Sequence, residues 1–230
     1  MTDHLPPVID PSPRSLLAAL EAWLSAGGSR VGEAVILRGP DGSFRIRHHA
    51  DAAEPVLTIH RTPEAAREVA KYDAAGEFRP LKSAPTLIRG WEIMLPDTLS
   101  LMQALDFLYP AALANWVRWL DGEAMAPPLR EALGRQTGIY RVTALLRDGE
   151  AEELVAGLCR EKCLRHVMWP LTAGHQWTAL PPEKQSAPRD GPGTGCPLPL
   201  LCLDPCPLLI GGARSAVKRR MKAESVSNGN

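Results

Sequence analysis

Two pairs of cysteines with the same C-x3-C spacing constrain the fold of this chain more than any other feature. Cys159 and Cys163 form the first pair, and Cys202 and Cys206 form the second. Four thiolates are able to enclose a metal centre, but only if two segments that are distant in the sequence meet. The spacing therefore predicts a fold in which these two segments come together around a shared inorganic group.

Composition and charge favour the metal-site interpretation of the cysteines. The 230 residues contain 26 Lys+Arg and 26 Asp+Glu, so no net charge attracts nucleic acid or a membrane surface. The first residues lack the basic and apolar regions of a signal peptide, and the apolar stretch 198–210 is interrupted by prolines. We therefore expect a cytoplasmic protein without a membrane span, in which clustered thiols bind metal rather than form disulfides.

The elements expected along the chain give an α+β fold class in which a small α+β unit precedes a mostly helical module. Apolar periodicity predicts a helix over 15–26, and Gly39-Pro-Asp-Gly42 predicts the turn of a hairpin. A strand is expected at 56–60, and residues 95–166 read as helical throughout, with Asp97 as a helix cap. The expected organisation is a flexible N-terminus (1–13), the α+β unit (14–78), the helical module (79–222) with a flexible loop (172–197), and a disordered tail (223–230).

The two cysteine pairs are expected in different local structures. On a helix beginning near Glu150, Val155, Cys159 and Cys163 would lie on one stripe. Cys206 lies between Pro205 and Pro207, which places the second pair in an irregular loop. Backbone N–H groups in such a loop are free to donate hydrogen bonds to sulfur.

The spacing leaves three interpretations open. Structural zinc sites more often use C-x2-C or C-x4-C pairs on turns, so two C-x3-C pairs fit zinc poorly. The ending C-x3-C-P matches the tail of the bacterial ferredoxin run, although its preceding part is missing. Cysteines also occur in cores as small apolar residues without any metal. We favour an iron–sulfur cluster over zinc, and zinc over buried thiols.

The segments around the cysteines resemble the [4Fe-4S] cluster-binding module appended to CbiX-type sirohydrochlorin cobaltochelatases. The resemblance lies in C-R-E-K-C-L-R-H-V-M-W-P, in P-L-L-C-L-D-P-C-P-L-L-I, and in the upstream F-R-P-L-K-S-A-P-T-L-I-R-G-W, which is similar to that family's stabilising region. It spans roughly residues 55–220 and implies a [4Fe-4S] cofactor with Cys159, Cys163, Cys202 and Cys206 as ligands. Cys196 is a fifth candidate that competes with Cys202, and no chelatase domain is recognised.

Other residues near the cysteines invite weaker interpretations. Of Arg160, Lys162, Arg165 and His166, at most two are expected to face a cluster. Trp169 is expected to pack over the site and limit water. His48 and His49, adjacent in a strand, should point to opposite faces, and we expect surface histidines there. The chain contains no G-x-S-x-G, no H-E-x-x-H and no phosphate-binding glycine loop, so catalysis by side chains alone is not expected.

The sequence thus predicts an accessory iron–sulfur protein rather than an enzyme. Its role would be electron transfer, redox sensing or support of a chelatase or redox partner, with a link to tetrapyrrole metal insertion and cobalamin biosynthesis implied by the resemblance. One alternative is a redox-responsive regulator that contacts nucleic acid through a helix pair at 128–135 and 139–146 and through the basic end of the chain. The other is a zinc-stapled interaction module.

Overall fold

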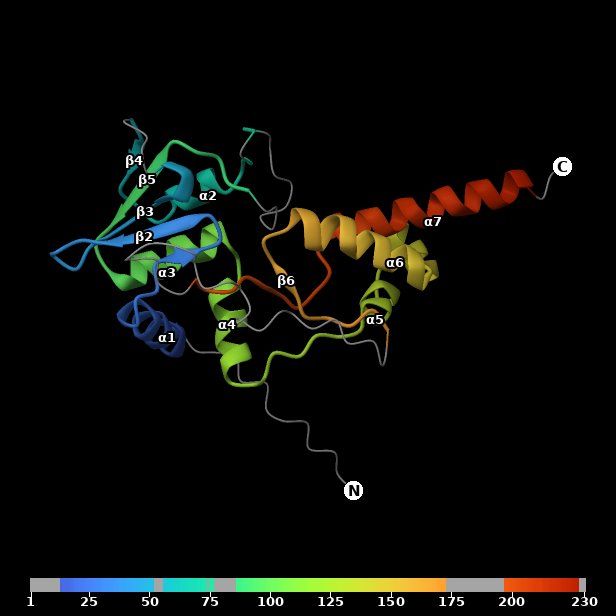
Figure 1. Ribbon diagram of the computed structural model, residues 1–230, viewed down its shortest axis with the longest axis horizontal. Helices are drawn as coiled ribbons and strands as arrows, with labels where there is room; N and C mark the ends of the chain where they lie inside the picture. The colour runs from blue at the N-terminus through green and yellow to red at the C-terminus, as the bar shows by residue number, and fades with distance from the viewer. Residues whose placement is uncertain (1–12, 52–55, 74, 77–85, 173–196, 228–230) are drawn as a thin grey trace, which may run out of the picture.

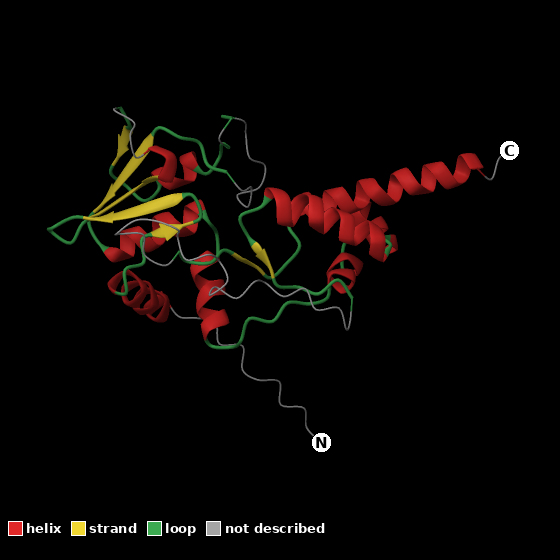
Figure 2. Cartoon of the chain, viewed as in Figure 1, coloured by secondary structure: helices red, strands yellow, loops and turns green. Residues whose placement is uncertain are grey.

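Two hydrophobic cores organise the protein in a computed structural model that describes residues 13–51, 56–73, 75–76, 86–172 and 197–227 (Figures 1 and 2). The first core lies in an α+β unit, and the second lies in a mostly helical unit. The predicted fold class is therefore confirmed. Among the described helices, none is both long enough and apolar enough to cross a membrane.

A five-stranded mixed sheet forms the centre of the first unit. Its order is β1-β2-β3-β5-β4, in which β4 pairs with β5 in parallel and the other neighbours are antiparallel. The strands are β1 (Arg30–Val31), β2 (Ala34–Arg38), β3 (Phe44–His48), β4 (Thr58–His60) and β5 (Trp91–Leu95). Alternate residues of β3 are buried, because successive side chains of a strand point to opposite faces.

The predicted hairpin is confirmed as the β2–β3 connection. Gly42 has φ +83°, a conformation that glycine adopts without steric cost. Asp41 closes the turn, because its Oδ1 accepts the backbone N–H of Ser43 at 3.1 Å and the Ser43 hydroxyl at 2.6 Å. The register that follows pairs Ile36 with Ile46 and directs both side chains into the core.

Helices pack against this sheet and against each other. They are α1 (Pro13–Ser25), the 3-10 turn η1 (His49–Asp51), α2 (Ala65–Val69), α3 (Thr98–Leu108) and α4 (Ala112–Leu120). Asp97 caps α3 as predicted, with its carboxylate accepting the N–H of Ser100 at 2.7 Å. No strand was expected at 91–95, but this segment forms β5, which lies between β3 and β4. Together β5, α3 and α4, assigned by sequence to the second unit, bury their apolar residues in the first core.

The second unit is built on short helical segments packed against one long helix. The segments are α5 (Leu129–Gly134), the 3-10 helix η2 (Gly138–Leu145), α6 (Asp148–Leu154) and the π-helical turn η3 (Val155–Arg160), and the long helix is α7 (Pro207–Ser227). The prediction that 95–166 is helical throughout is wrong, since 123–128 and 163–165 are irregular and β6 (His166–Val167) pairs with β7 (Leu201–Cys202). Residues 223–227, expected in the tail, continue α7.

The helix pair suggested for nucleic-acid contact is also not formed. Residues 138–145 adopt a 3-10 helix, and the preceding α-helix has only six residues. One cation of the basic end is paired within the unit, since Arg220 contacts Glu150 at 3.1 Å, and the acid Glu224 on the same helix pairs with Arg147 at 2.9 Å. These contacts hold α7 against α6.

The segment before the second cysteine pair joins the two units. Leu198 and Leu200 are buried in the first core, and the Leu198 N–H donates to the Arg30 carbonyl at 2.9 Å. Leu201, the residue after Leu200, begins β7, and the chain then enters the second unit (Figure 1). The position of the second cysteine pair is therefore determined partly by the first unit.

Gly32 lies where the two units join, and its surroundings predict that a larger side chain there would destabilise the fold. It has φ +55°, and a Cβ there would lie 2.6 Å from the Tyr109 side chain and 2.9 Å from Leu200. Tyr109 has little room to move, because its hydroxyl accepts the Glu33 N–H at 2.8 Å. Gly32→Ala is expected to reduce the free energy of unfolding by about 1–3 kcal/mol through overpacking. The measurement is chemical denaturation followed by circular dichroism.

Gly42→Ala is the matched control for this substitution. Gly42 also has a positive φ, of +83°, but no atom lies within 4 Å of its added Cβ. The loss of unfolding free energy in Gly42→Ala therefore measures the cost of backbone strain alone. Equal losses for the two variants would show that crowding at the joint contributes nothing.

Candidate metal centre

The first cysteine pair lies at the end of the α6–η3 helix. Cys159 is inside the π-helical turn, and Cys163 follows directly after the last helical residue. The expected single stripe of Val155, Cys159 and Cys163 is therefore not formed, because a π-helical turn changes the helical register and the helix ends before Cys163. Val155 is buried in the second core, while both cysteines are half-buried beside the joint.

The second pair brackets a short irregular loop, as predicted. Cys202 ends the strand β7, and Cys206 immediately precedes Pro207, the first residue of α7. Proline suits that position because its fixed φ is helical and its missing N–H has no helical acceptor. The positive end of the α7 dipole consequently lies beside Cys206, which favours a group of net negative charge nearby.

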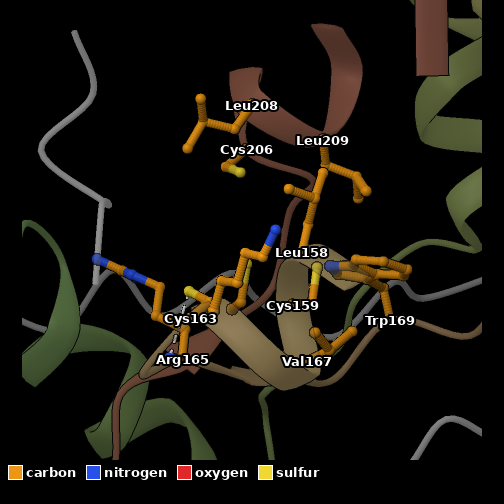
Figure 3. Close-up of a pocket in the computed structure, with 11 residues that line it drawn as sticks. Leu158, Cys159, Cys163, Arg165, Val167, Trp169, Cys206, Leu208 and Leu209 are labelled. Atoms are coloured by element: carbon orange, nitrogen blue, oxygen red, sulfur yellow. Dashed lines mark hydrogen bonds between the residues drawn. The ribbon is translucent and has the colours of Figure 1, made fainter. Parts of the chain in front are cut away.

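All four cysteines line a single cavity of about 280 Å³ (Figure 3). The remaining lining is mostly apolar, with two cations at its edge. It consists of Leu158, Lys162, Arg165, Val167, Trp169, Leu208 and Leu209. Two segments distant in the sequence thus meet at one site, which is the arrangement that the cysteine spacing predicted.

Burial disfavours the thiolate form of three of the four cavity thiols when no metal is bound. Burial, followed by the charges of the other three cysteines, raises the pKa of Cys159 from 9.0 to about 12. Burial likewise raises the pKa of Cys202 to about 11. Burial also raises the pKa of Cys163, although the Arg165 N–H, 3.5 Å from its sulfur, opposes the rise. A metal centre has to displace these protons before the sulfurs can ligate it.

The volume of the cavity, about 280 Å³, fits a cluster better than a single ion. Tetrahedral zinc holds thiolates at about 2.3 Å, which sets their sulfurs roughly 3.8 Å apart. Within the described ranges, the one set of three metal-ligating side chains whose ligand atoms lie within 4.8 Å of one another is Glu33, His48 and His49. The cysteines instead surround a cavity, as a larger inorganic group requires.

A buried donor at the same cavity also fits an inorganic sulfur group. The indole of Trp169 is fully buried, and its Nε1–H has no hydrogen-bond acceptor among the described residues. Such a donor is costly to leave unpaired, and cluster or thiolate sulfur is the kind of acceptor that would satisfy it. The donor set, the cavity and this N–H together fit an iron–sulfur group.

Comparison with known families agrees with this chemistry. Residues 17–119 match the family of the DR2241 stabilising domain, and residues 121–215 match that of the 4Fe-4S iron-sulfur cluster binding domain. The chain joins a stabilising domain to a [4Fe-4S] cluster-binding domain. Its cofactor is a [4Fe-4S] cluster, as predicted.

One solved structure shows both domains together. DR2241 from Deinococcus radiodurans, described as a multi-domain protein with structural similarity to chelatases and with two additional novel domains, is 27% identical to this chain and superposes with a TM-score of 0.71. The match covers 90% of this chain and 42% of that protein. The chain therefore spans less than half the length of DR2241. A search of curated proteins gives no match.

The boundary between the two matched families coincides with the change of core. The stabilising domain contains the sheet and α1 to α4, and the cluster-binding domain contains α5 to α7 with all four cavity cysteines. Leu198 and Leu200 are the exception, since they belong to the cluster-binding domain by sequence but are buried in the stabilising domain's core.

The cations near the first cysteine pair and the fifth cysteine, Cys196, were also candidates from the sequence. Of the four cations near the first pair, Lys162 and Arg165 line the cavity of the cluster-binding domain, in agreement with the expected maximum of two. Arg165 also donates to the carbonyls of Leu201 and of Pro110 in the stabilising domain, each at 3.2 Å. Cys196 lies outside the described residues.

The histidines of the stabilising domain differ from expectation. His48 is buried, and its ring stacks on that of His49 with centroids 4.8 Å apart, because the strand ends at His48 and a 3-10 turn begins. The His48 Nδ1 accepts the Ala50 N–H at 3.0 Å, so the ring proton lies on Nε2, 3.3 Å from the Glu33 carboxylate. We interpret this group as a buried polar contact, because a metal would need that Nε2 lone pair.

The raised thiol pKa values predict how the metal-free protein responds to alkali. A thiol whose pKa rises on folding contributes stability below its unfolded pKa, and loses it as the pH passes through the folded value. Metal-free protein should therefore lose stability between about pH 9 and about pH 12, the range bounded by the values of Cys159. Urea denaturation at a series of pH values under reducing conditions measures this loss.

A variant without two of the three thiols of raised pKa controls this prediction. The double substitution Cys159→Ser and Cys202→Ser should flatten the alkaline loss, because serine does not titrate in this range. Identical slopes for wild type and variant would contradict the assignment of the loss to these thiols.

Proposed function

We propose that Cys159, Cys163, Cys202 and Cys206 are the four ligands of the [4Fe-4S] cluster, and that the loaded chain transfers electrons for a chelatase-like partner. The observation that supports the ligand set is the single cavity that all four side chains line. The bound cluster would supply one-electron chemistry. Four thiolates would leave no iron open to a substrate, which favours electron transfer over substrate binding at the metal.

The chain's own residues suit this role in two ways. Apolar side chains from η3, β6 and α7 line the cavity and limit the access of water to it. Lys162 and Arg165 place positive charge at its edge, which favours the more negative, reduced state. Lys162 and the half-exposed Leu208 lie at the rim, where a redox partner would approach.

The partner class rests on similarity. DR2241 is described as similar to chelatases, and the cysteine segments resemble the module appended to CbiX-type cobaltochelatases. We infer that the partner inserts metal into a tetrapyrrole such as sirohydrochlorin, a step of cobalamin biosynthesis. The chain would then act in the cytoplasm as an accessory protein rather than as the chelatase.

Anaerobic purification followed by iron, sulfide and zinc analysis tests cofactor identity. The expected result is a brown protein with about four irons and four sulfides per chain and an EPR signal that appears on reduction. Stoichiometric zinc in a colourless protein would overturn the proposal in favour of a zinc-stapled module. A DNA mobility shift that depends on the cluster's oxidation state would favour the regulator instead.

Binding to a CbiX-type chelatase tests the partner. The cluster-loaded chain is expected to bind the chelatase in anaerobic interferometry, and metal-free protein is expected to bind at least several-fold more weakly. Lys162→Glu serves as the surface variant, since it reverses a charge at the rim while leaving the cysteines in place. Equal binding by all three proteins would contradict a contact at the cluster.

A further inference from the structure

The indole N–H of Trp169 is a buried donor whose partner is missing from the described structure. The side chain has no exposed area, its Nε1 has no hydrogen-bond acceptor among the described residues, and the ring lines the cavity that contains the four cysteines. Buried polar groups are normally paired, so an unpaired one that faces a ligand cavity indicates a partner on the ligand.

The position of the ring is fixed independently of the cavity. The carbonyl of Pro170 accepts the Leu129 N–H at 2.6 Å, and the carbonyl of Leu171 accepts the Arg130 N–H at 3.3 Å. Both bonds anchor the segment to the start of α5, and the indole is packed in the second core. The N–H is therefore held in place before any cofactor enters.

The position of Trp169 beside the strand β7 indicates which cysteine accepts its N–H. Figure 3 shows the indole nitrogen turned toward the cysteine side chains. The Met168 N–H donates to the Cys202 carbonyl at 3.1 Å, so the pairing of β6 with β7 places the neighbouring Trp169 beside Cys202, and both side chains line the cavity. The Cys202 S–H itself donates to the Asp204 carbonyl at 3.0 Å. Loss of that proton on ligation would make the sulfur a stronger acceptor.

We propose that Trp169 is a positioning residue that donates a hydrogen bond from its indole N–H to the Cys202 sulfur of the assembled centre and raises the reduction potential of the cluster. This inference rests on the proposed ligation by Cys202. A donor to sulfur withdraws negative charge from the centre and stabilises its reduced form. The effect is strong here because the donor is fully buried.

Trp169→Phe tests the inference, because phenylalanine keeps an aromatic ring but lacks the N–H. An anaerobic redox titration followed by EPR should show a lower potential in the variant. At a fixed ambient potential, the ratio of reduced to oxidised cluster is expected to fall about tenfold, equivalent to about 59 mV for one electron. Trp116→Phe is the control, since Trp116 packs against the stabilising domain's core and should leave the potential unchanged.

A second measurement uses unaltered protein and does not depend on folding of the variant. Wild type labelled with 15N in the tryptophan indole is loaded, reduced and examined by pulsed EPR. A hyperfine coupling to an indole nitrogen, with an exchangeable proton that is lost in D2O, is expected, and it should be absent from Trp169→Phe if that variant retains its cluster. No indole coupling in wild type, or an unchanged potential in loaded Trp169→Phe, would overturn the inference.

The outcomes separate this inference from the proposed function. Wild type without iron and sulfide would refute the proposed function. Loaded wild type that keeps its cluster when Cys202 is replaced would refute the ligation by Cys202. Loaded wild type that depends on Cys202 but lacks the coupling would refute the role of Trp169 alone.

Discussion

Replacing any one of Cys159, Cys163, Cys202 and Cys206 by serine is expected to abolish stable cluster binding. The four side chains line one cavity, so each variant would leave one iron without its thiolate. We expect iron and sulfide to fall to a small fraction of the wild-type content, and the broad visible absorption to be lost. Anaerobic purification of the four variants in parallel, with metal analysis and EPR, measures this effect.

Cys196→Ser is the matched control for the series. The sequence left Cys196 in competition with Cys202, and its position lies outside the described residues. The cavity contains Cys202, so Cys196→Ser should retain iron, sulfide and colour. Retention of the cluster by Cys202→Ser together with its loss from Cys196→Ser would reverse the assignment.

Local signals in the sequence predicted the elements that depend on local chemistry. The turn at Gly39–Gly42 and the cap at Asp97 were both recognisable, because turn and cap residues act within a few positions. The β5 strand was missed because its sequence lacks alternation. Four of its five residues are buried, and a strand buried on both faces does not show the period of two.

The sequence predicted which cysteines meet at the candidate site, but not the local geometry that brings them together. The four cysteines meet as the spacing required, whereas the π-helical turn around Cys159 carries no recognisable sequence signal. The role of the segment 198–200 was also missed. Its apolar residues read as part of an irregular loop, and only the tertiary fold shows that Leu198 and Leu200 are buried in the core of the other domain.

That burial explains how the stabilising domain could influence a centre held by the other domain. Leu200 is two residues before Cys202 and is anchored in the first core, and Leu201 accepts hydrogen bonds from Arg165 at 3.2 Å and from Asn115 at 3.4 Å. The strand that positions Cys202 is thus held from both domains. We call the packing of Leu198 and Leu200 in the first core the Leu198–Leu200 anchor. Weakening it should displace the second cysteine pair without altering any proposed ligand.

Leu200→Ala is therefore expected to accelerate loss of the cluster by more than its effect on the free energy of unfolding would explain. Truncating a fully buried leucine reduces the free energy of unfolding by about 2–5 kcal/mol. Because the lost contacts anchor the segment leading to Cys202, we also expect the loaded protein to lose its visible absorption several-fold faster in the presence of an iron chelator. The measurements are denaturation of the metal-free protein and chelator kinetics of the loaded protein.

Leu101→Ala separates the two effects. Leu101 lies on α3, is buried in the same core and is equally apolar, but it does not lie in the segment that carries the cysteines. It should reduce the free energy of unfolding by a similar amount and leave chelator resistance near that of wild type at temperatures where both variants are folded. If the two variants lose the cluster at equal rates, the stabilising domain acts through global stability, and the Leu198–Leu200 anchor has no specific role at the metal centre.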